Sequence, residues 1–219
     1  MDFFTIFFPW KGVLLDMHHE ARHFMKYVTE TFPDSFKRKR VLDVGSGDIN
    51  GNNRWMFTEC EYHGNDVAQA PNVTIVSKTK DLPFDDLSFD TIVSTECFEH
   101  DPEYEDSLKK MYRMLKPGGL MAFTCASTGR PEHGTRRTSP GDSYGTKYQV
   151  EGMVDYYKNL TQDDIRQVFD IEKDFDMCRM YYNERSHDLY MFGRKRGIET
   201  RDIANGYTAN GATCVFKHN

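Results

Sequence analysis

A glycine-rich turn in the first quarter of the chain has the composition of a ligand-binding loop. It consists of Gly45, Ser46 and Gly47 and directly follows residues 41–44, an aliphatic run typical of a buried parallel strand. Glycines let the backbone turn sharply and let a ligand approach it closely. With Gly51 the spacing is G-x-G-x-x-x-G, which is neither the dinucleotide fingerprint nor a Walker A loop. Alone, the turn indicates either a ligand loop or an ordinary connection from strand to helix.

Asp66 favours the interpretation of the glycine turn as a ligand-binding loop. It closes an expected strand 19 residues after Gly47, and an acid about 20 residues beyond a glycine loop is placed to accept hydrogen bonds from ribose hydroxyls. An aspartate there could also be a simple turn residue. The loop and the acid together indicate a ligand that contains a nucleoside.

Two histidines are candidate general bases. His100 closes the segment ECFEH after an expected strand, and His133 lies in the polar segment GRPEHGTRR. An unperturbed imidazole has a pKa of about 6.5, so a neutral ring is available at pH 7 to accept a proton. The alternative for each is a histidine that only orders its loop.

The segment around His133 is locally basic in a chain that is acidic overall. Arginine binds phosphate and carboxylate groups through two parallel hydrogen bonds, so the segment predicts contact with an anionic substrate. The alternative is a solvated loop, and the nearby tyrosine could equally be a packing residue. The candidate substrate residues are Arg130, Arg136, Arg137 and Tyr144.

Metal binding is not expected from the sequence. His19 and His23 share a helix face with His18 beside them, but no acid or cysteine completes a recognisable ligand set. The five cysteines include no C-x-x-C pair, so no zinc site is predicted. Free thiols in a reducing compartment, the cytoplasm, are expected instead.

Composition restricts the class of partner. The 219 residues carry 28 Lys and Arg against 34 Asp and Glu, a formal charge of −6, which argues against nucleic acid as the main partner because phosphate contacts need clustered positive charge. The apolar segment 3–15 is shorter than the roughly 20 residues of a membrane span and lacks a basic start. We therefore predict no membrane span and expect the segment to pack on the core or at an active-site edge, with contact to a membrane surface as the alternative.

Strand-like and helix-like segments alternate along most of the chain. Helices are expected at 16–32, 49–58 and 101–115, strands at 41–44, 61–66, 73–77, 88–95 and 120–125, and a closing hairpin at 177–183 and 188–195. Thr161 and Asp164 resemble a capping box at the start of another helix. This alternation predicts a doubly wound α/β sheet, whose ligands bind outside the carboxyl ends of the strands.

Five segments in this order give the chain its family resemblance: VLDVGSG (41–47), Asp66, DLPFDDLSFDTIVST (81–95), ECFEH (96–100) and LKPGG (115–119). The chain resembles a class I S-adenosylmethionine-dependent methyltransferase of the type-11 or ubiquinone-biosynthesis-like group. The resemblance implies a Rossmann-like sheet of seven strands, mostly parallel with a C-terminal antiparallel hairpin. One domain is then expected, with an N-terminal cap (1–36), a cofactor half (37–125), a substrate-side part (126–196) and a poorly ordered tail (197–219).

The resemblance also implies roles for individual residues. The glycine turn would lie beneath the methionine part of the cofactor, Asp43 would order that turn or bind the cofactor's amino group, and Asp66 would hold the ribose. Arg54 would reach the cofactor carboxylate or lie at the surface. The cofactor set is completed by Val67 next to the ribose acid, by Thr79, Lys80 and Leu82 along the adenine, and by Thr95 and Glu96 at the methionine end.

The leading hypothesis is an enzyme that transfers methyl from S-adenosylmethionine, leaving S-adenosylhomocysteine, to a small polar or anionic acceptor such as a sugar or sugar nucleotide. One alternative is a catalytically inactive binding subunit, because Lys78 stands where the family often has an acid near the adenine. Another is a protein methyltransferase. We expect a small-molecule substrate, no nucleic acid, and a monomer or homodimer.

Overall fold

The computed structural model describes residues 17–197 and 211–218. The apolar segment 3–15 and most of the expected tail lie outside these ranges.

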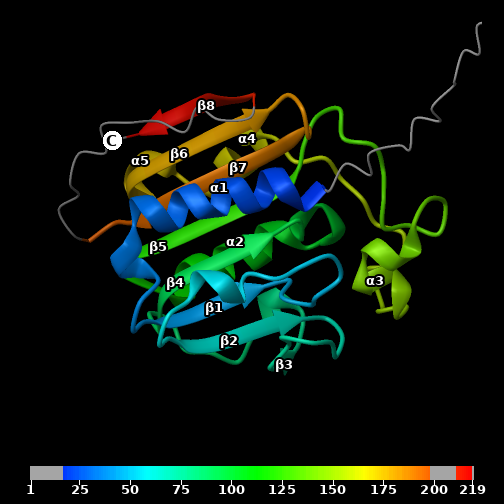
Figure 1. The fold of residues 1–219 in the computed structure, drawn as a ribbon, viewed down its shortest axis with the longest axis horizontal. Helices are drawn as coiled ribbons and strands as arrows, with labels where there is room; N and C mark the ends of the chain where they lie inside the picture. The colour runs from blue at the N-terminus through cyan, green and yellow to red at the C-terminus, as the bar shows by residue number, and fades with distance from the viewer. Residues whose placement is uncertain (1–16, 198–210, 219) are drawn as a thin grey trace, which may run out of the picture.

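The described residues form one eight-stranded sheet in the order β3-β2-β1-β4-β5-β7-β6-β8 (Figure 1). The pairs from β3 to β5 are parallel, and those from β5 to β8 are antiparallel. The strands are β1 (Arg40–Val44), β2 (Glu61–Asp66), β3 (Ile75–Val76), β4 (Phe89–Thr95), β5 (Leu115–Ala126), β6 (Phe175–Asn183), β7 (Asp188–Lys195) and β8 (Ala212–His218). The predicted mostly parallel sheet with a closing hairpin is confirmed.

The prediction of seven strands and a poorly ordered tail is wrong for residues 212–218. These residues form β8, which pairs antiparallel with β6. The unpaired edge of β6 offers a row of backbone donors and acceptors, and a β-branched and aromatic segment can satisfy them. Phe216 also packs against the main core. The glycines between 197 and 211 hide this strand in the sequence pattern.

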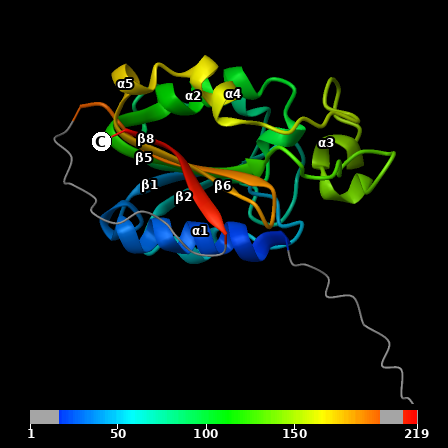
Figure 2. The ribbon, with the colours of Figure 1, turned by 90° about the horizontal axis from the view of Figure 1, so that it is seen from above.

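Helices cover both faces of the sheet, as Figure 2 shows. On one face lies α1 (Met17–Thr31), whose Phe24 stacks on Tyr190 of β7 at 4.7 Å between ring centroids. On the other face lie α2 (Tyr104–Met114), α4 (Gln162–Val168) and α5 (Ile171–Asp174). The predicted capping box is confirmed, because Thr161 and Asp164 exchange both hydrogen bonds at the start of α4. The doubly wound arrangement is therefore present.

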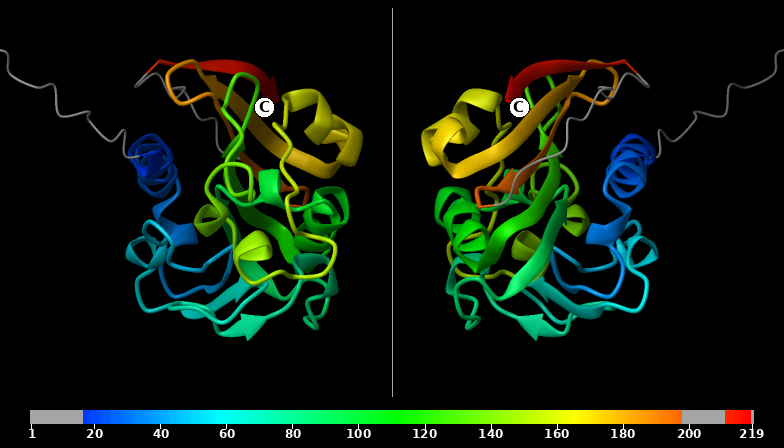
Figure 3. Two further views of the ribbon diagram at one scale, coloured as in Figure 1. Left: turned by 90° about the vertical axis from the view of Figure 1, so that its right-hand side faces the viewer. Right: turned by 90° about the vertical axis from the view of Figure 1, so that its left-hand side faces the viewer.

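The carboxyl ends of the parallel strands carry the longest irregular segments. Between β1 and β2 the expected helix is reduced to the single turn η2 (Arg54–Met56), because the polar run from Asn50 to Asn53 favours turns. Residues 127–160 contain only η5 (Pro140–Asp142) and α3 (Tyr144–Lys147). The segment around α3 stands off this end of the sheet in Figures 1 and 2, and it faces the viewer when this end is seen from the front (Figure 3, left). The remaining short turns are η1 (Pro33–Ser35), η3 (Thr79–Asp81) and η4 (Phe98–His100).

Within the described ranges, every helix is too short or too polar to cross a membrane. All five cysteines carry free thiols, as predicted.

Candidate functional site

A cavity of about 240 Å³ opens at the carboxyl ends of β1, β2 and β4. Its volume lies slightly below the roughly 300–1,000 Å³ of typical ligand sites. The ring of Tyr144 lines it and lies against the glycine turn. The start of α1 and the segment around α3 close its other sides. The predicted residues that it brings together are Gly45, Gly47, Asp66, Val67, Thr95, Glu96, His100, Arg130, His133 and Tyr144.

The glycine turn has the geometry that the sequence predicts. Gly45 adopts a φ of +69°, a left-handed conformation that favours glycine. Gly47 has no room for a side chain, since a Cβ there would overlap the Tyr144 ring and lie 2.8 Å from an oxygen of Asp66. Ser46 does not belong to the described cavity lining and is buried, and its backbone N–H donates to the carbonyl of Asn65.

Asp66 is fixed at the end of β2 by backbone donors. Its two oxygens accept hydrogen bonds from the N–H groups of Gly47 (3.0 Å) and Val67 (2.7 Å). Burial nevertheless raises the pKa of Asp66 to about 6. Each carboxylate oxygen keeps a second lone pair, so the group can still accept from hydroxyls of a ligand in the cavity.

Asp43 acts on the cavity through a neighbour rather than directly. It is fully buried in β1 and accepts hydrogen bonds from Asn53 and from the Tyr62 hydroxyl, both at 2.9 Å. Asn53 also donates to Thr95 at 3.2 Å and lines the cavity. Sequence reasoning missed Asn53, although the polar run that precedes η2 marks this segment as a loop above the strands.

Carboxylates gather at the end of the cavity beyond β4. Glu96 adopts a left-handed backbone (φ 49°), a conformation uncommon outside glycine and concentrated at functional sites. It accepts from the Thr124 hydroxyl at 2.8 Å and lies 3.7 Å from Arg130. Arg130 is itself buried and forms an ion pair with Asp188 at 2.6 Å.

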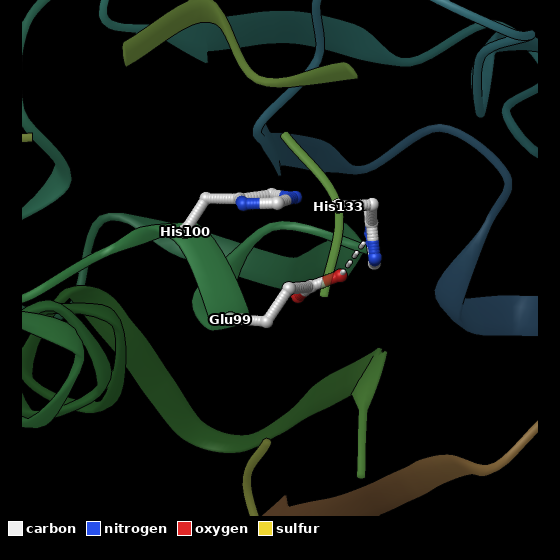
Figure 4. Close-up of side chains that lie close together, drawn as sticks. All are labelled: Glu99, His100 and His133. Atoms are coloured by element: carbon white, nitrogen blue, oxygen red, sulfur yellow. Dashed lines mark ion pairs between the residues drawn. The ribbon is translucent and has the colours of Figure 1, made fainter. Parts of the chain in front are cut away.

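Glu99, His100 and His133 form a tight group beside Glu96 (Figure 4). Glu99 and His100 come from η4, and His133 comes from the loop after β5, with its ring 4.9 Å from that of His100. Burial lowers the pKa of His100 to about 3 and also lowers the pKa of His133, so both rings are neutral at pH 7. Burial raises the pKa of Glu99 well above its usual range. Sequence reasoning missed Glu99, for which the E-x-x-E-H spacing of residues 96–100 is the only signal.

Besides Asp43 and Ser46, four residues that the resemblance assigned to the cofactor lie outside the described cavity lining. Arg54 stacks over the Tyr62 ring at 4.1 Å. Lys80 forms an ion pair with Glu103 at 3.3 Å. The other two are buried among protein groups: Thr79 donates to the side chain of Asn65, and Leu82 belongs to the main core.

The arginines of the basic segment lie in different environments in the structure. Only Arg130 reaches the described cavity, while Arg136 and Arg137 are exposed and form ion pairs at 2.7 Å with Asp155 and Glu132. Their side chains are therefore engaged at the surface. Of the three predicted substrate arginines, Arg130 therefore lines the cavity and the other two do not.

The N-terminal helix contributes residues that the sequence did not single out for the cavity. His19 and Arg22 of α1 line it, and Arg22 lies over the ring of Trp55 at 4.7 Å.

Among the described residues, the one group of side chains arranged to hold a metal ion is Glu99, His100 and His133, with no member from the N-terminal histidines.

Comparisons with known proteins agree with this geometry. Residues 42–123 match the family model described as a methyltransferase domain. Malonyl-acyl-carrier-protein O-methyltransferase of Enterobacter lignolyticus is 29% identical over 95 residues, which cover 39% of this chain and 38% of that protein. Phosphoethanolamine N-methyltransferase 2 of Caenorhabditis elegans is 27% identical over 122 residues, covering 48% and 28% of the two chains. The matches thus span about a third of these relatives.

Solved structures share the fold. A suggested sarcosine dimethylglycine methyltransferase from Galdieria sulphuraria has a TM-score of 0.56 at 16% identity, covering 81% of this chain and 85% of that one. Phosphoethanolamine N-methyltransferase 2 of Haemonchus contortus, solved in complex with S-adenosyl-L-methionine, has a TM-score of 0.55 at 16% identity, covering 80% and 53%. At this identity the likeness establishes the fold alone.

Proposed function

We propose that this chain, whose residues 42–123 match the methyltransferase-domain family model, is a class I S-adenosylmethionine-dependent enzyme that transfers a methyl group to a small polar acceptor. S-adenosylmethionine supplies the activated methyl, and S-adenosylhomocysteine is the second product. The observation that carries the proposal is that one cavity joins the glycine turn and Asp66 to the polar group of Glu96, His100 and His133.

The cofactor end of the cavity fits an adenosyl ligand. Asp66 presents free lone pairs for ribose hydroxyls, and backbone donors hold it in place. The space that a Cβ would take at Gly47 lets a ligand lie against the backbone. Tyr144 must turn aside to admit the adenosine, after which its ring can cover the bound ligand. Asn53, held by Asp43, supports the methionine end from the opposite wall.

The acceptor end suits a polar group with hydroxyls, such as those of a sugar. Glu96, His100 and His133 offer acceptors of hydrogen bonds there. An anionic acceptor such as a sugar nucleotide would need a cation, and Arg130 is already paired with Asp188. Arg22 of α1 is the cavity-lining cation that we assign to such a group.

His100 and His133 are the side chains that we assign to the reacting acceptor. Nδ1 of His133 lies 3.1 Å from the Pro131 carbonyl, which can only accept, so Nδ1 carries the proton and Nε2 keeps its lone pair. The lone pair on Nε2 of His133 accepts a hydrogen bond from the acceptor hydroxyl and holds its oxygen toward the cofactor end of the cavity. Orientation is the main contribution that such a protein makes, because the reactive group belongs to the cofactor.

Two measurements test the proposal. Calorimetric titration of the full chain with S-adenosylhomocysteine should give saturable binding, and absence of heat at millimolar ligand would overturn the cofactor assignment. Incubation of a metabolite extract with the protein and methyl-labelled S-adenosylmethionine should then yield a labelled small molecule by mass spectrometry. Binding without any labelled product across a broad acceptor panel would favour the inactive binding subunit. Label on protein alone would favour a protein methyltransferase.

A further inference from the structure

Glu99, His100 and His133 converge on one point at the acceptor end of the cavity. Each offers a ligand atom, and these atoms all lie within 4.8 Å of one another. Figure 4 shows that the three side chains face a common space although they come from two separate segments. Helix and loop packing alone does not require two imidazoles and a carboxylate to point toward each other.

The polar atoms of this group lack the partners that burial demands. Glu99 has no exposed surface, and neither of its oxygens accepts a hydrogen bond from the described residues; Nδ1 of His100 is likewise buried without a partner. An unpaired buried carboxylate is strongly unfavourable. Nε2 of His133, which keeps its lone pair, lies 3.9 Å from Oε1 of Glu99. When Glu99 is ionised, three electron-pair donors thus face one another, and no described residue places a proton donor or cation between them.

The surrounding charges are also unbalanced. Three buried or nearly buried carboxylates (Glu96, Glu99 and Asp188) surround a single guanidinium, that of Arg130. If all four groups are ionised, their net charge is −2. A divalent cation beside Glu99 would balance this charge and give the orphaned atoms their partner.

We propose that Glu99, His100 and His133 bind a divalent transition-metal ion at the acceptor end of the cavity. Two imidazoles with one carboxylate form a donor set suited to Zn²⁺, Mn²⁺ or Co²⁺ rather than to Mg²⁺, which prefers oxygen ligands. Metal–ligand bonds of about 2.0–2.2 Å separate neighbouring ligand atoms by roughly 3–4 Å. The ion would therefore draw the three side chains slightly closer together. Because both histidines line the cavity, its open coordination positions would face the acceptor.

The catalytic use of this ion rests on the proposed function. A divalent ion lowers the pKa of a hydroxyl bound to it, so the acceptor would be an alcohol or phenol whose oxygen it binds. The hydroxyl proton passes to water, and an oxygen lone pair forms the new O–CH₃ bond. The S–CH₃ bond breaks as this bond forms, and its electron pair neutralises the sulfonium to a thioether. The substrate class is then a hydroxyl acceptor, and a separate protein base becomes unnecessary.

Metal binding can be tested without the cofactor or the acceptor. Full-length protein without an affinity tag is stripped with chelator and titrated with Co²⁺, followed by visible absorption, and with Zn²⁺, followed by calorimetry. The expected result is one ion per chain, with Co²⁺ bands of a nitrogen- and oxygen-ligated site. Glu99→Gln and His133→Asn should each weaken binding by at least tenfold. His63→Asn, which alters a histidine paired with Glu61 on β2, should bind as the wild type does.

The outcomes separate this site from the proposed function. The metal site is overturned if the protein binds no stoichiometric metal ion, or if Glu99→Gln and His133→Asn both leave metal binding unchanged. The affinity for S-adenosylhomocysteine tests the proposed methyltransferase function separately. Asp66→Ala should lose cofactor affinity and retain Co²⁺. If one of the two variants Glu99→Gln and His133→Asn changes the far-ultraviolet circular dichroism spectrum, its fold is altered, and metal binding by the other variant then tests the site. Once an acceptor is known, chelator should abolish O-methylation and Zn²⁺, Mn²⁺ or Co²⁺ should restore it; full activity in chelator overturns the catalytic role.

Discussion

The carboxylate of Asp66 accepts a hydrogen bond from the backbone N–H of Gly47 at 3.0 Å, and this bond ties the carboxyl end of β2 to the turn that follows β1. A second bond from the N–H of Val67 fixes the other oxygen. The acid is therefore held rigid at the cavity before any ligand arrives. Rigid placement reduces the ordering cost of binding.

Asp66→Ala should weaken binding of S-adenosylhomocysteine, because it removes the acceptor that we assign to the ribose hydroxyls. Loss of hydrogen bonds to a charged group costs about 1–3 kcal/mol, which corresponds to roughly a 5- to 150-fold increase in Kd. Calorimetric titration measures it. Asp106→Ala on the outer side of α2, where Asp106 is exposed, is the matched control and should bind normally. Unchanged affinity in Asp66→Ala would refute the ribose assignment.

Gly47→Ala should also impair binding, for a steric reason. Its Cβ would enter the cavity, meet the Tyr144 ring and approach Asp66. We expect an increase in Kd for S-adenosylhomocysteine of at least about tenfold, equivalent to roughly 1.4 kcal/mol. The control is Gly141→Ala, because a Cβ at Gly141 would meet open space. Equal affinities for the two variants would mean that no ligand approaches the backbone at Gly47.

The arginines of the basic segment should differ sharply in their effect on stability. Arg130 is buried in an ion pair with Asp188, and removing one partner of such a pair costs about 3–5 kcal/mol. Arg136 is exposed, and its pair with Asp155 should contribute at most about 1 kcal/mol. Urea denaturation of Arg130→Met and Arg136→Met measures the free energies of unfolding. Similar losses in both variants would contradict a structural role specific to Arg130.

Sequence patterns predicted the sheet and the proximity of the glycine turn to Asp66. Buried parallel strands appear as aliphatic runs, and their carboxyl ends meet at one edge, so Gly47 and Asp66 could be brought together from strand order alone. The strand β8 was missed because its pairing depends on the free edge of β6, which no local pattern reveals.

Residues in turns were predicted less well, because spacing does not fix the direction of a side chain in a short turn. Lys80 and Leu82 stand at positions that the resemblance assigns to the cofactor, but one pairs with Glu103 and the other enters the core. Glu99 and His133 lie 34 positions apart, and only the path of the loop after β5 makes them neighbours. The prediction of no metal site was based only on the N-terminal histidines and the cysteines.

Asp43 should give the protein a stability that falls as pH rises. Burial raises the folded-state pKa of Asp43 from its usual 3.8 to about 6, so the folded state binds this proton more tightly than the unfolded state does. The stabilisation is then fully present below about pH 4 and is lost as pH increases to about 6, an effect on the order of 2–3 kcal/mol. In Asp43→Asn the amide can accept from Asn53 and donate to the Tyr62 hydroxyl, so the hydrogen bonds survive without the titration. Urea denaturation between about pH 4 and pH 7 should show that the free energy of unfolding of the variant rises relative to that of the wild type by that amount as pH increases. Parallel stability curves for the two proteins would mean that Asp43 keeps an ordinary pKa in the fold.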